Sequence, residues 1–242
     1  MQTVILSGGL ATRLRPLTET TPKAMIPVAG RPFIDHQLQL LSRNGIKDVV
    51  LCLGYLGEQI EAFVGDGSAW SLRVKYSWER EELLGTGGAL KLAEPLLDKT
   101  FFLTYGDSYL PIDYVEVAEA FLRGSNLGMM VVYENEDRFD RSNVVIDGTL
   151  VCKYDKQEWT PDMVYIDYGL TALKKEAVEL IPAGTESALD MLIKSLVAAK
   201  QLAAFITTTR FFEIGSWQGI RDLEMFLTSK TRVLDSEQQN SG

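Results

Sequence analysis

A short, uninterrupted apolar segment near the N-terminus most constrains the fold of this chain. Residues 3–6 read TVIL and lack the polar alternation of a half-exposed strand. Such a run is typical of a strand that helices cover on both faces in a parallel sheet. The run ends at Ser7-Gly8-Gly9, so this turn lies at the carboxyl end of the predicted strand, where α/β sheets bind ligands.

Strand and helix patterns alternate along the first half of the chain. We expect strands over 48–53, 72–76 and 100–104 and helices over 32–41, 57–64 and 86–97. Two further helix–strand pairs are expected between Asp113 and Tyr133. The alternation predicts an α/β protein with a Rossmann-like, mostly parallel sheet and helices on both faces.

The pattern changes in the second half of the chain. Shorter strand signals run from Asn143 to about Leu173 around Asp147-Gly148, a dipeptide typical of a β-hairpin. They predict a small β-rich lobe, and a helix is expected over 187–200. We therefore expect a single domain over 1–234, with a first half of about 1–135, a lobe of about 136–210, and a polar tail over 235–242.

The glycine-rich turn opens a locally basic stretch in an acidic protein. The formal net charge is −9, yet the first 31 residues contain Arg13, Arg15, Lys23 and Arg31 against one acid, Glu19. Adjacent glycines permit positive φ and a close approach to a ligand, and exposed backbone N–H groups bind anions. Arginine and lysine add phosphate ligands. These residues favour a phosphate site, although a solvated turn remains an alternative on the same residues.

Two common phosphate motifs and several protein classes are excluded. The chain has neither the G-x-x-x-x-G-K-[ST] P-loop nor the G-x-G-x-x-G dinucleotide fingerprint at this turn. It has no apolar run long enough to span a membrane, no export signal and only two cysteines. Its acidity disfavours nucleic acid. We expect a cytoplasmic protein without a nucleic-acid or membrane partner; homo-oligomerisation stays open.

The N-terminal string is similar to the signature of a known family. The pattern G-G-x-x-[ST]-R-[LM]-x-P-L-T followed by P-K-x-M-x-P-V resembles that of the sugar-1-phosphate nucleotidyltransferases. The matching positions are Gly8, Gly9, Thr12, Arg13, Leu14, Pro16, Leu17, Thr18, Pro22, Lys23, Met25, Pro27 and Val28. The loop Gly85-Thr86-Gly87-Gly88 looks most like that of guanylyl- and uridylyltransferases acting on mannose-, heptose- or muramate-type 1-phosphates.

This resemblance implies an enzyme and its substrates. We expect Mg²⁺-dependent transfer of a nucleotidyl group from an NTP to a sugar 1-phosphate, giving an NDP-sugar and pyrophosphate. GTP is slightly favoured, with UTP and CTP open. The resemblance implies catalytic roles for Arg13 and Lys23. The nucleotide-binding residues that it implies are Leu6, Ser7, Gly8, Gly9, Thr12, Gly85, Thr86 and Gly87.

Further residues are candidates for the metal and for the sugar phosphate. Asp107 follows an apolar strand and one glycine, which places a carboxylate at the rim of the sheet, where Mg²⁺ is commonly held. The family has a second ligand in an Asp-x-Gly segment, which here carries Glu213. The resemblance also implies that Asp107, Lys156, Asp167 and Gly169 bind the sugar phosphate in the β-rich lobe.

Two other functions remain open from the sequence. One is a cytidylyltransferase with a non-sugar phosphate acceptor such as phosphocholine. The other is a non-catalytic sensor of an NDP-sugar, which the replacement of the family Asp by Glu213 keeps under consideration.

Overall fold

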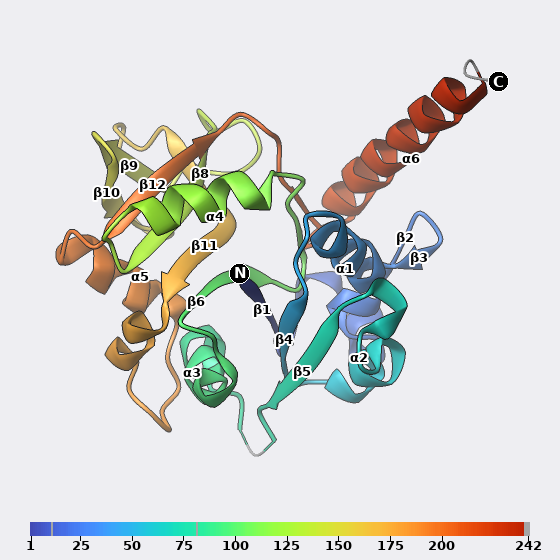
Figure 1. Cartoon of the computed structure of the whole chain (residues 1–242), viewed down its shortest axis with the longest axis horizontal. Coiled ribbons are helices and arrows are strands. Elements are labelled where there is room, and N and C mark those ends of the chain that lie inside the picture. Colours follow the sequence, from blue (N-terminus) through green and yellow to red (C-terminus); the bar gives the residue numbers. More distant parts are fainter. Residues whose placement is uncertain (11, 81, 240–242) are drawn as a thin grey trace.

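A computed structural model of the chain describes residues 1–10, 12–80 and 82–239, with side chains up to residue 229. A sheet of nine strands forms its centre, in the order β5-β4-β1-β6-β11-β8-β12-β10-β9 (Figure 1). Along the chain these strands are β1 (Gln2–Ser7), β4 (Asp48–Leu53), β5 (Arg73–Trp78), β6 (Thr100–Tyr105), β8 (Gly128–Glu134), β9 (Val144–Asp147), β10 (Leu150–Tyr154), β11 (Tyr165–Lys174) and β12 (Leu202–Thr207).

The first half of the sheet is parallel. β1 lies between β4 and β6, and Val4 is opposite Val50 on one side and Leu103 on the other. Side chains of β1 alternate between the faces, yet both faces are buried, because Val4 and Ile5 belong to different core clusters and are 0% exposed. The apolar run therefore has the environment that its sequence predicts.

Helices cover both faces of the sheet, as expected. One core cluster contains apolar side chains of α1 (Phe33–Arg43), α2 (Gly57–Val64) and α4 (Tyr114–Arg123). The other contains side chains of α3 (Gly85–Leu92) and α5 (Leu189–Ala198). The α/β class is confirmed.

The second half of the sheet differs from the expected small lobe. β11 runs antiparallel to both β6 and β8, so the strands after residue 135 extend the same sheet instead of forming a separate one. The sheet is consequently mixed, with four parallel pairings on β1, β4, β5, β6, β8 and β12. The predicted hairpin is present, since β9 and β10 pair antiparallel around Gly148 at φ +59°.

Two predicted helical segments need correction. Between Asp113 and Tyr133 there is one helix–strand pair, α4 and β8, not two. The predicted 86–97 helix ends at Leu92, and a 3₁₀ turn with a proline in its first positions follows over Glu94–Leu96. Proline removes a backbone donor and breaks an α-helix, which explains the earlier end.

Short strand pairs and a long helix complete the chain. The pairs are β2 (Pro27–Val28) with β3 (Arg31–Pro32), and β7 (Ser108–Tyr109) with β13 (Phe212–Glu213). The last helix, α6 (Trp217–Gln239), begins against the domain and extends away from the sheet (Figure 1). It includes part of the 235–242 segment expected to be a tail; residues 240–242 lie outside the described residues.

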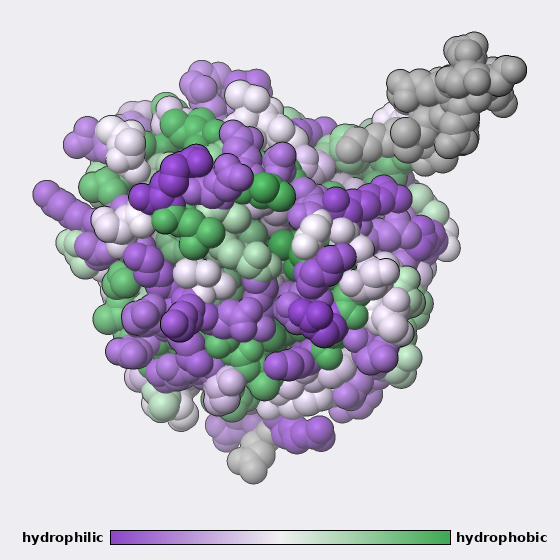
Figure 2. Space-filling model, viewed as in Figure 1, coloured by the Kyte–Doolittle hydropathy of each residue, from purple (hydrophilic) through white to green (hydrophobic). Residues whose placement is uncertain are grey.

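The surface carries apolar side chains in small groups among hydrophilic ones on the face seen in Figure 2. Among the described residues, no helix has the length and apolar character needed to cross a membrane.

Candidate active site

The carboxyl ends of β1 and β6 meet in very close contact. The backbone N–H of Gly106 donates to the carbonyl of Leu6 at 2.9 Å. A Cβ atom at position 106 would overlap the Ser7 side chain, so only glycine allows the two strand ends to come this near. The contact places the Ser7-Gly8-Gly9 turn beside Asp107.

A cavity of about 380 Å³ opens at these strand ends. Six of the eight residues predicted to bind nucleotide line it: Leu6, Ser7, Gly8, Gly9, Gly85 and Thr86. Lys23 also lines it, as do Leu10, Ala24, Leu83 and Ala89, whose apolar side chains suit the flat faces of a base. Thr12 and Gly87 do not line this cavity.

The glycine turn works by close approach and not by positive φ. Neither Gly8 nor Gly9 has a positive φ, so of the two properties that glycine permits here the turn uses only the close approach. A Cβ at Gly8 would lie 2.5 Å from Glu79 Oε2 and 3.2 Å from the Gly54 nitrogen. Gly8 therefore admits Glu79, the residue directly after β5, into the wall of the cavity.

The second glycine-rich segment, residues 84–88, packs mainly against the residues at the start of α5. The N–H of Gly87 donates to the Ser187 carbonyl at 2.8 Å, and Thr86 Oγ1 accepts from the Leu189 N–H at 2.9 Å. A Cβ at Gly87 would collide with the Ser187 side chain. The close approach that these glycines permit is thus to the start of α5, while Gly85 and Thr86 still line the cavity.

Lys23 and Asp107 form an ion pair across the inner end of the cavity. Lys23 Nζ lies 2.8 Å from Asp107 Oδ2, and both side chains are about one fifth to one quarter exposed, at 19% and 25%. Asp107 also lines a second, larger cavity of about 710 Å³. Tyr105 and Asp107 line both cavities and therefore mark their junction.

The larger cavity brings together the other predicted residues. Its walls include Arg13, Asp107, Lys156, Asp167, Gly169 and Glu213. Arg13 lies in the first 3₁₀ turn, Asp107 follows β6 and Lys156 follows β10. Asp167 and Gly169 lie on β11, and Glu213 lies on β13. Residues as distant in sequence as Arg13 and Glu213 thus share one cleft.

Glu213 lies near a second carboxylate. Burial and the negative charge of Asp107 raise the pKa of Glu213. Arg13 and Lys23 act against this rise. The described residues contain no group of three or more His, Cys, Asp or Glu side chains arranged for a metal. Two carboxylates that line the same cavity nevertheless match the donor set of Mg²⁺, which takes one or two carboxylates plus phosphate oxygens and water.

Lys156 is held between acidic and aromatic groups. Its Nζ lies 3.7 Å from Asp167 Oδ2 and 3.7 Å from Asp190 Oδ1. Burial opposes its charge, but Asp167, Tyr105 and Asp190 outweigh burial and raise the pKa of the ammonium group. Lys156 therefore stays cationic, as a ligand for a phosphate requires.

Asp167 supports this arrangement and is largely covered. Its side chain is only 9% exposed, and Oδ1 accepts from the Gly169 N–H at 2.9 Å. Gly169 has φ +90° at an irregularity of β11, a conformation that favours glycine. The Asp167 side chain thus shapes the strand and holds Lys156.

Several residues that line the cavities lie outside the sequence motifs that predicted the site. In the smaller cavity these include Glu79, whose place after a strand could have indicated it. In the larger one they include Arg138, Arg141, Trp159 and Arg210, which follow no recognisable motif.

The chain is similar to known proteins in sequence and in fold. The model of the nucleotidyl transferase family matches residues 2–143. A mannose-1-phosphate guanyltransferase of Yarrowia lipolytica is 31% identical over 222 residues, covering 89% of this chain and 61% of the relative. An N-acetylmuramate alpha-1-phosphate uridylyltransferase of Neisseria meningitidis is 40% identical over 128 residues, covering 52% of this chain and 54% of the relative.

A solved structure shares the whole fold. HddC from Yersinia pseudotuberculosis, crystallised with GMP-PN, is 27% identical with a TM-score of 0.79, covering 93% of this chain and 99% of that one. Among the curated relatives, this chain spans 61% of the Yarrowia protein and 63% of a Synechocystis UTP–glucose-1-phosphate uridylyltransferase.

Replacing Gly87 by alanine tests the contact between the glycine loop and α5. The new Cβ must displace Ser187, so we expect Gly87→Ala to lower the free energy of unfolding by about 1–3 kcal/mol. Urea denaturation measures this change.

Gly9→Ala is the matched control, because a Cβ at Gly9 meets nothing within 4 Å. Its stability should stay within about 0.5 kcal/mol of the wild type. Equal destabilisation by both variants would contradict the role assigned to the Gly87 contact.

Proposed function

We propose that this chain, which belongs to the nucleotidyl transferase family, transfers a nucleotidyl group from an NTP to a sugar 1-phosphate and releases pyrophosphate. The observation that carries this proposal is the junction of the two cavities at Asp107. The glycine-rich smaller cavity suits the NTP, and the larger one, with Lys156, suits the sugar phosphate. The reacting phosphates then meet where the cavities join.

The chemistry needs no base from the protein. A sugar 1-phosphate oxygen is already an anion and attacks the α-phosphorus, while the bond to pyrophosphate breaks. The contribution of the protein is positioning and charge stabilisation. Lys23 neutralises the α-phosphate, Arg13 the leaving pyrophosphate, and Lys156 the acceptor phosphate.

Asp107 and Glu213 are the residues that would hold a Mg²⁺ ion. Burial and the charge of Asp107 together raise the pKa of Glu213, and a cation between the two carboxylates would relieve their repulsion, which supports this assignment. Glutamate at position 213 supplies the same oxygen ligands as aspartate on a longer stem. A bound Mg²⁺ supplies Lewis-acid neutralisation of phosphate charge.

A quaternary ammonium acceptor such as phosphocholine fits the larger cavity poorly. Binding of such a cation relies on free aromatic faces. Here two of the rings that line the cavity already lie against cations of the protein: Arg141 lies 5.1 Å from the Trp159 centroid and Arg210 lies 4.3 Å from that of Phe139. The observation favours a sugar over choline.

The proposal is tested by screening pyrophosphate release from four NTPs against a panel of sugar 1-phosphates, with and without Mg²⁺. We expect a metal-dependent signal for at least one pair and a loss of roughly 10²–10³ in rate for Lys23→Met. Absence of pyrophosphate from every pair, while NDP-sugars still bind, would favour the sensor instead.

The Lys23–Asp107 ion pair predicts competition between Lys23 and a metal ion. Without nucleotide, Lys23→Met should bind Mn²⁺ up to about fivefold more tightly, since a partly exposed ion pair is worth up to about 1 kcal/mol. Electron paramagnetic resonance measures free Mn²⁺. Lys99→Met, outside both cavities, controls for net charge and should leave the affinity unchanged. Weaker Mn²⁺ binding by Lys23→Met would contradict the competition.

Glu79 supports GTP as the nucleotide. Its Oε1 accepts from the Leu84 N–H at 2.7 Å, while Oε2 lies against Gly8 at the cavity wall. A carboxylate is acceptor-only and complements the adjacent N1–H and N2–H groups of guanine. Uracil offers one such donor between two acceptors and is a poorer match.

Replacing this carboxylate tests the choice of base. Glu79→Gln should weaken GTP binding by about 1–3 kcal/mol, the usual value of a bidentate contact to a base, with little effect on UTP. Glu82→Gln, on the same loop but outside the smaller cavity, is the control.

The pH dependence follows from burial, which raises the pKa of Glu79. GTP affinity of the wild type should fall as the pH decreases through this raised pKa, because protonation removes an acceptor. Calorimetry should find no such fall in Glu79→Gln. An identical pH profile in both proteins would exclude Glu79 from base recognition.

A further inference from the structure

The outer end of the larger cavity is built from a loop with many internal hydrogen bonds. Asn135 Nδ2 donates to the Asp140 carbonyl at 2.6 Å and to Ser142 Oγ at 3.1 Å, and Asp137 Oδ1 accepts from the Ser142 N–H at 2.7 Å. These bonds fix the backbone that carries Arg141. A residue on such a loop is held in place before a ligand arrives.

Arg141 is stacked and has no carboxylate partner. Its guanidinium carbon lies 5.1 Å from the centroid of Trp159, and both residues line the cavity. Within the described part of the chain Arg141 makes no ion pair; neighbouring Asp140 instead accepts from the Arg141 backbone N–H at 2.7 Å. Stacking over an indole leaves the edge of the guanidinium free, and this edge binds carboxylate or phosphate with two parallel hydrogen bonds.

The acidic residues of this cavity are mostly neutralised by cations of the protein. Asp155 pairs with Lys194 at 2.7 Å, and Asp222 pairs with Arg210. Asp167 lies 3.7 Å from Lys156. Their repulsion of an anionic ligand is therefore reduced, while the charge of Arg141 stays available.

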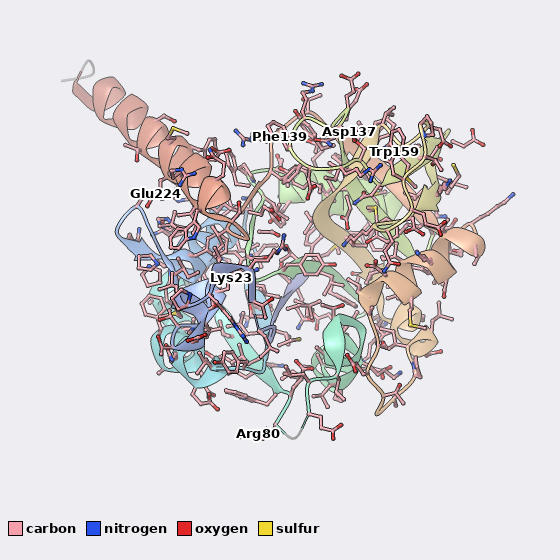
Figure 3. All side chains as sticks on the ribbon, turned by 180° about the vertical axis from the view of Figure 1, so that it is seen from behind. Lys23, Arg80, Asp137, Phe139, Trp159 and Glu224 are labelled. Atoms are coloured by element: carbon pink, nitrogen blue, oxygen red, sulfur yellow. The ribbon has the colours of Figure 1, made fainter. Side chains whose placement is uncertain are left out.

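Trp159 and the Arg141 guanidinium beside it lie away from Lys23 (Figure 3). The acceptor 1-phosphate must reach the junction at Tyr105 and Asp107, and Lys156 Nζ lies 5.6 Å from the Tyr105 ring. Trp159, by contrast, lies with Phe139 on the upper side of the view in Figure 3, apart from Lys23. A cavity of about 710 Å³ has room for a substituent beyond the sugar ring.

We infer that the acceptor carries a second anionic group, a carboxylate or a phosphate, and that Arg141 stacked on Trp159 binds it. The inference rests on the proposed function and narrows its substrate to acidic sugar 1-phosphates. Arg141 thereby determines specificity, while Lys156 and the junction residues serve the phosphate that reacts.

Matched acceptors test the inference, with kcat/KM measured by pyrophosphate release and Kd by calorimetry. The pairs are N-acetylglucosamine 1-phosphate with N-acetylmuramic acid 1-phosphate, and glucose 1-phosphate with glucuronic acid 1-phosphate. Glucose 1,6-bisphosphate supplies the second phosphate. We expect at least one anionic member to be preferred, and the carboxylate and bisphosphate arms then identify the group.

Arg141→Gln should raise KM and Kd for the preferred acceptor about 10- to 100-fold, as for loss of a hydrogen bond between charged groups. KM and Kd for the neutral acceptor of the same pair should not change. Arg123→Gln, exposed on α4 and outside both cavities, controls for net charge.

The outcomes separate this inference from the proposed function. Turnover with equal use of neutral and anionic acceptors would overturn the inference and leave the reaction intact. An anionic preference in Kd without any turnover would support the inference and contradict the reaction. The inference would be overturned if Arg141→Gln weakened the binding of the neutral and the anionic acceptor of a pair equally. It would also be overturned if no acceptor bound.

Discussion

The close contact between the carboxyl ends of β1 and β6 is the constraint on which the site depends. Gly106 allows the backbone of one strand to reach that of the other without a side chain between them. As a result, one strand delivers the glycine turn and its neighbour delivers Asp107 to the same point. Both cavities open from this point, because Asp107 lines each of them.

The fold was predictable where hydrophobic patterns are local. The bounds of β4 and α2 agree with the sequence prediction, because the residues of each element carry the local pattern that identifies it. After Asp48, β4 is an unbroken apolar run, and α2 places its buried apolar side chains four residues apart. The second half was harder. β11 carries an irregularity between Asp167 and Thr171 that breaks strand periodicity. Its antiparallel pairing with β6 also depends on contacts far apart in sequence, so no local pattern could join the lobe to the main sheet.

The site shows the same division between local and distant information. Four of the thirteen residues quoted in the N-terminal motif line a cavity, namely Gly8, Gly9, Arg13 and Lys23. Lys156, Asp167 and Glu213 share one cleft with Arg13. The sequence does not reveal why glycine is required at particular positions of the site. Gly8 leaves room for Glu79, which follows another strand, and Gly87 leaves room for Ser187, which precedes a helix far away in sequence. Such requirements exist only after the chain has folded.

The start of α5 contacts residues of both cavities through consecutive residues. Leu189 donates to Thr86 of the smaller cavity, 103 residues away in sequence. Asp190 accepts from Tyr154 and faces Lys156 of the larger cavity. The two cavities are therefore coupled through one helix end. A substitution that shifts the start of α5 to suit one cavity changes the surroundings of the other at the very next residue.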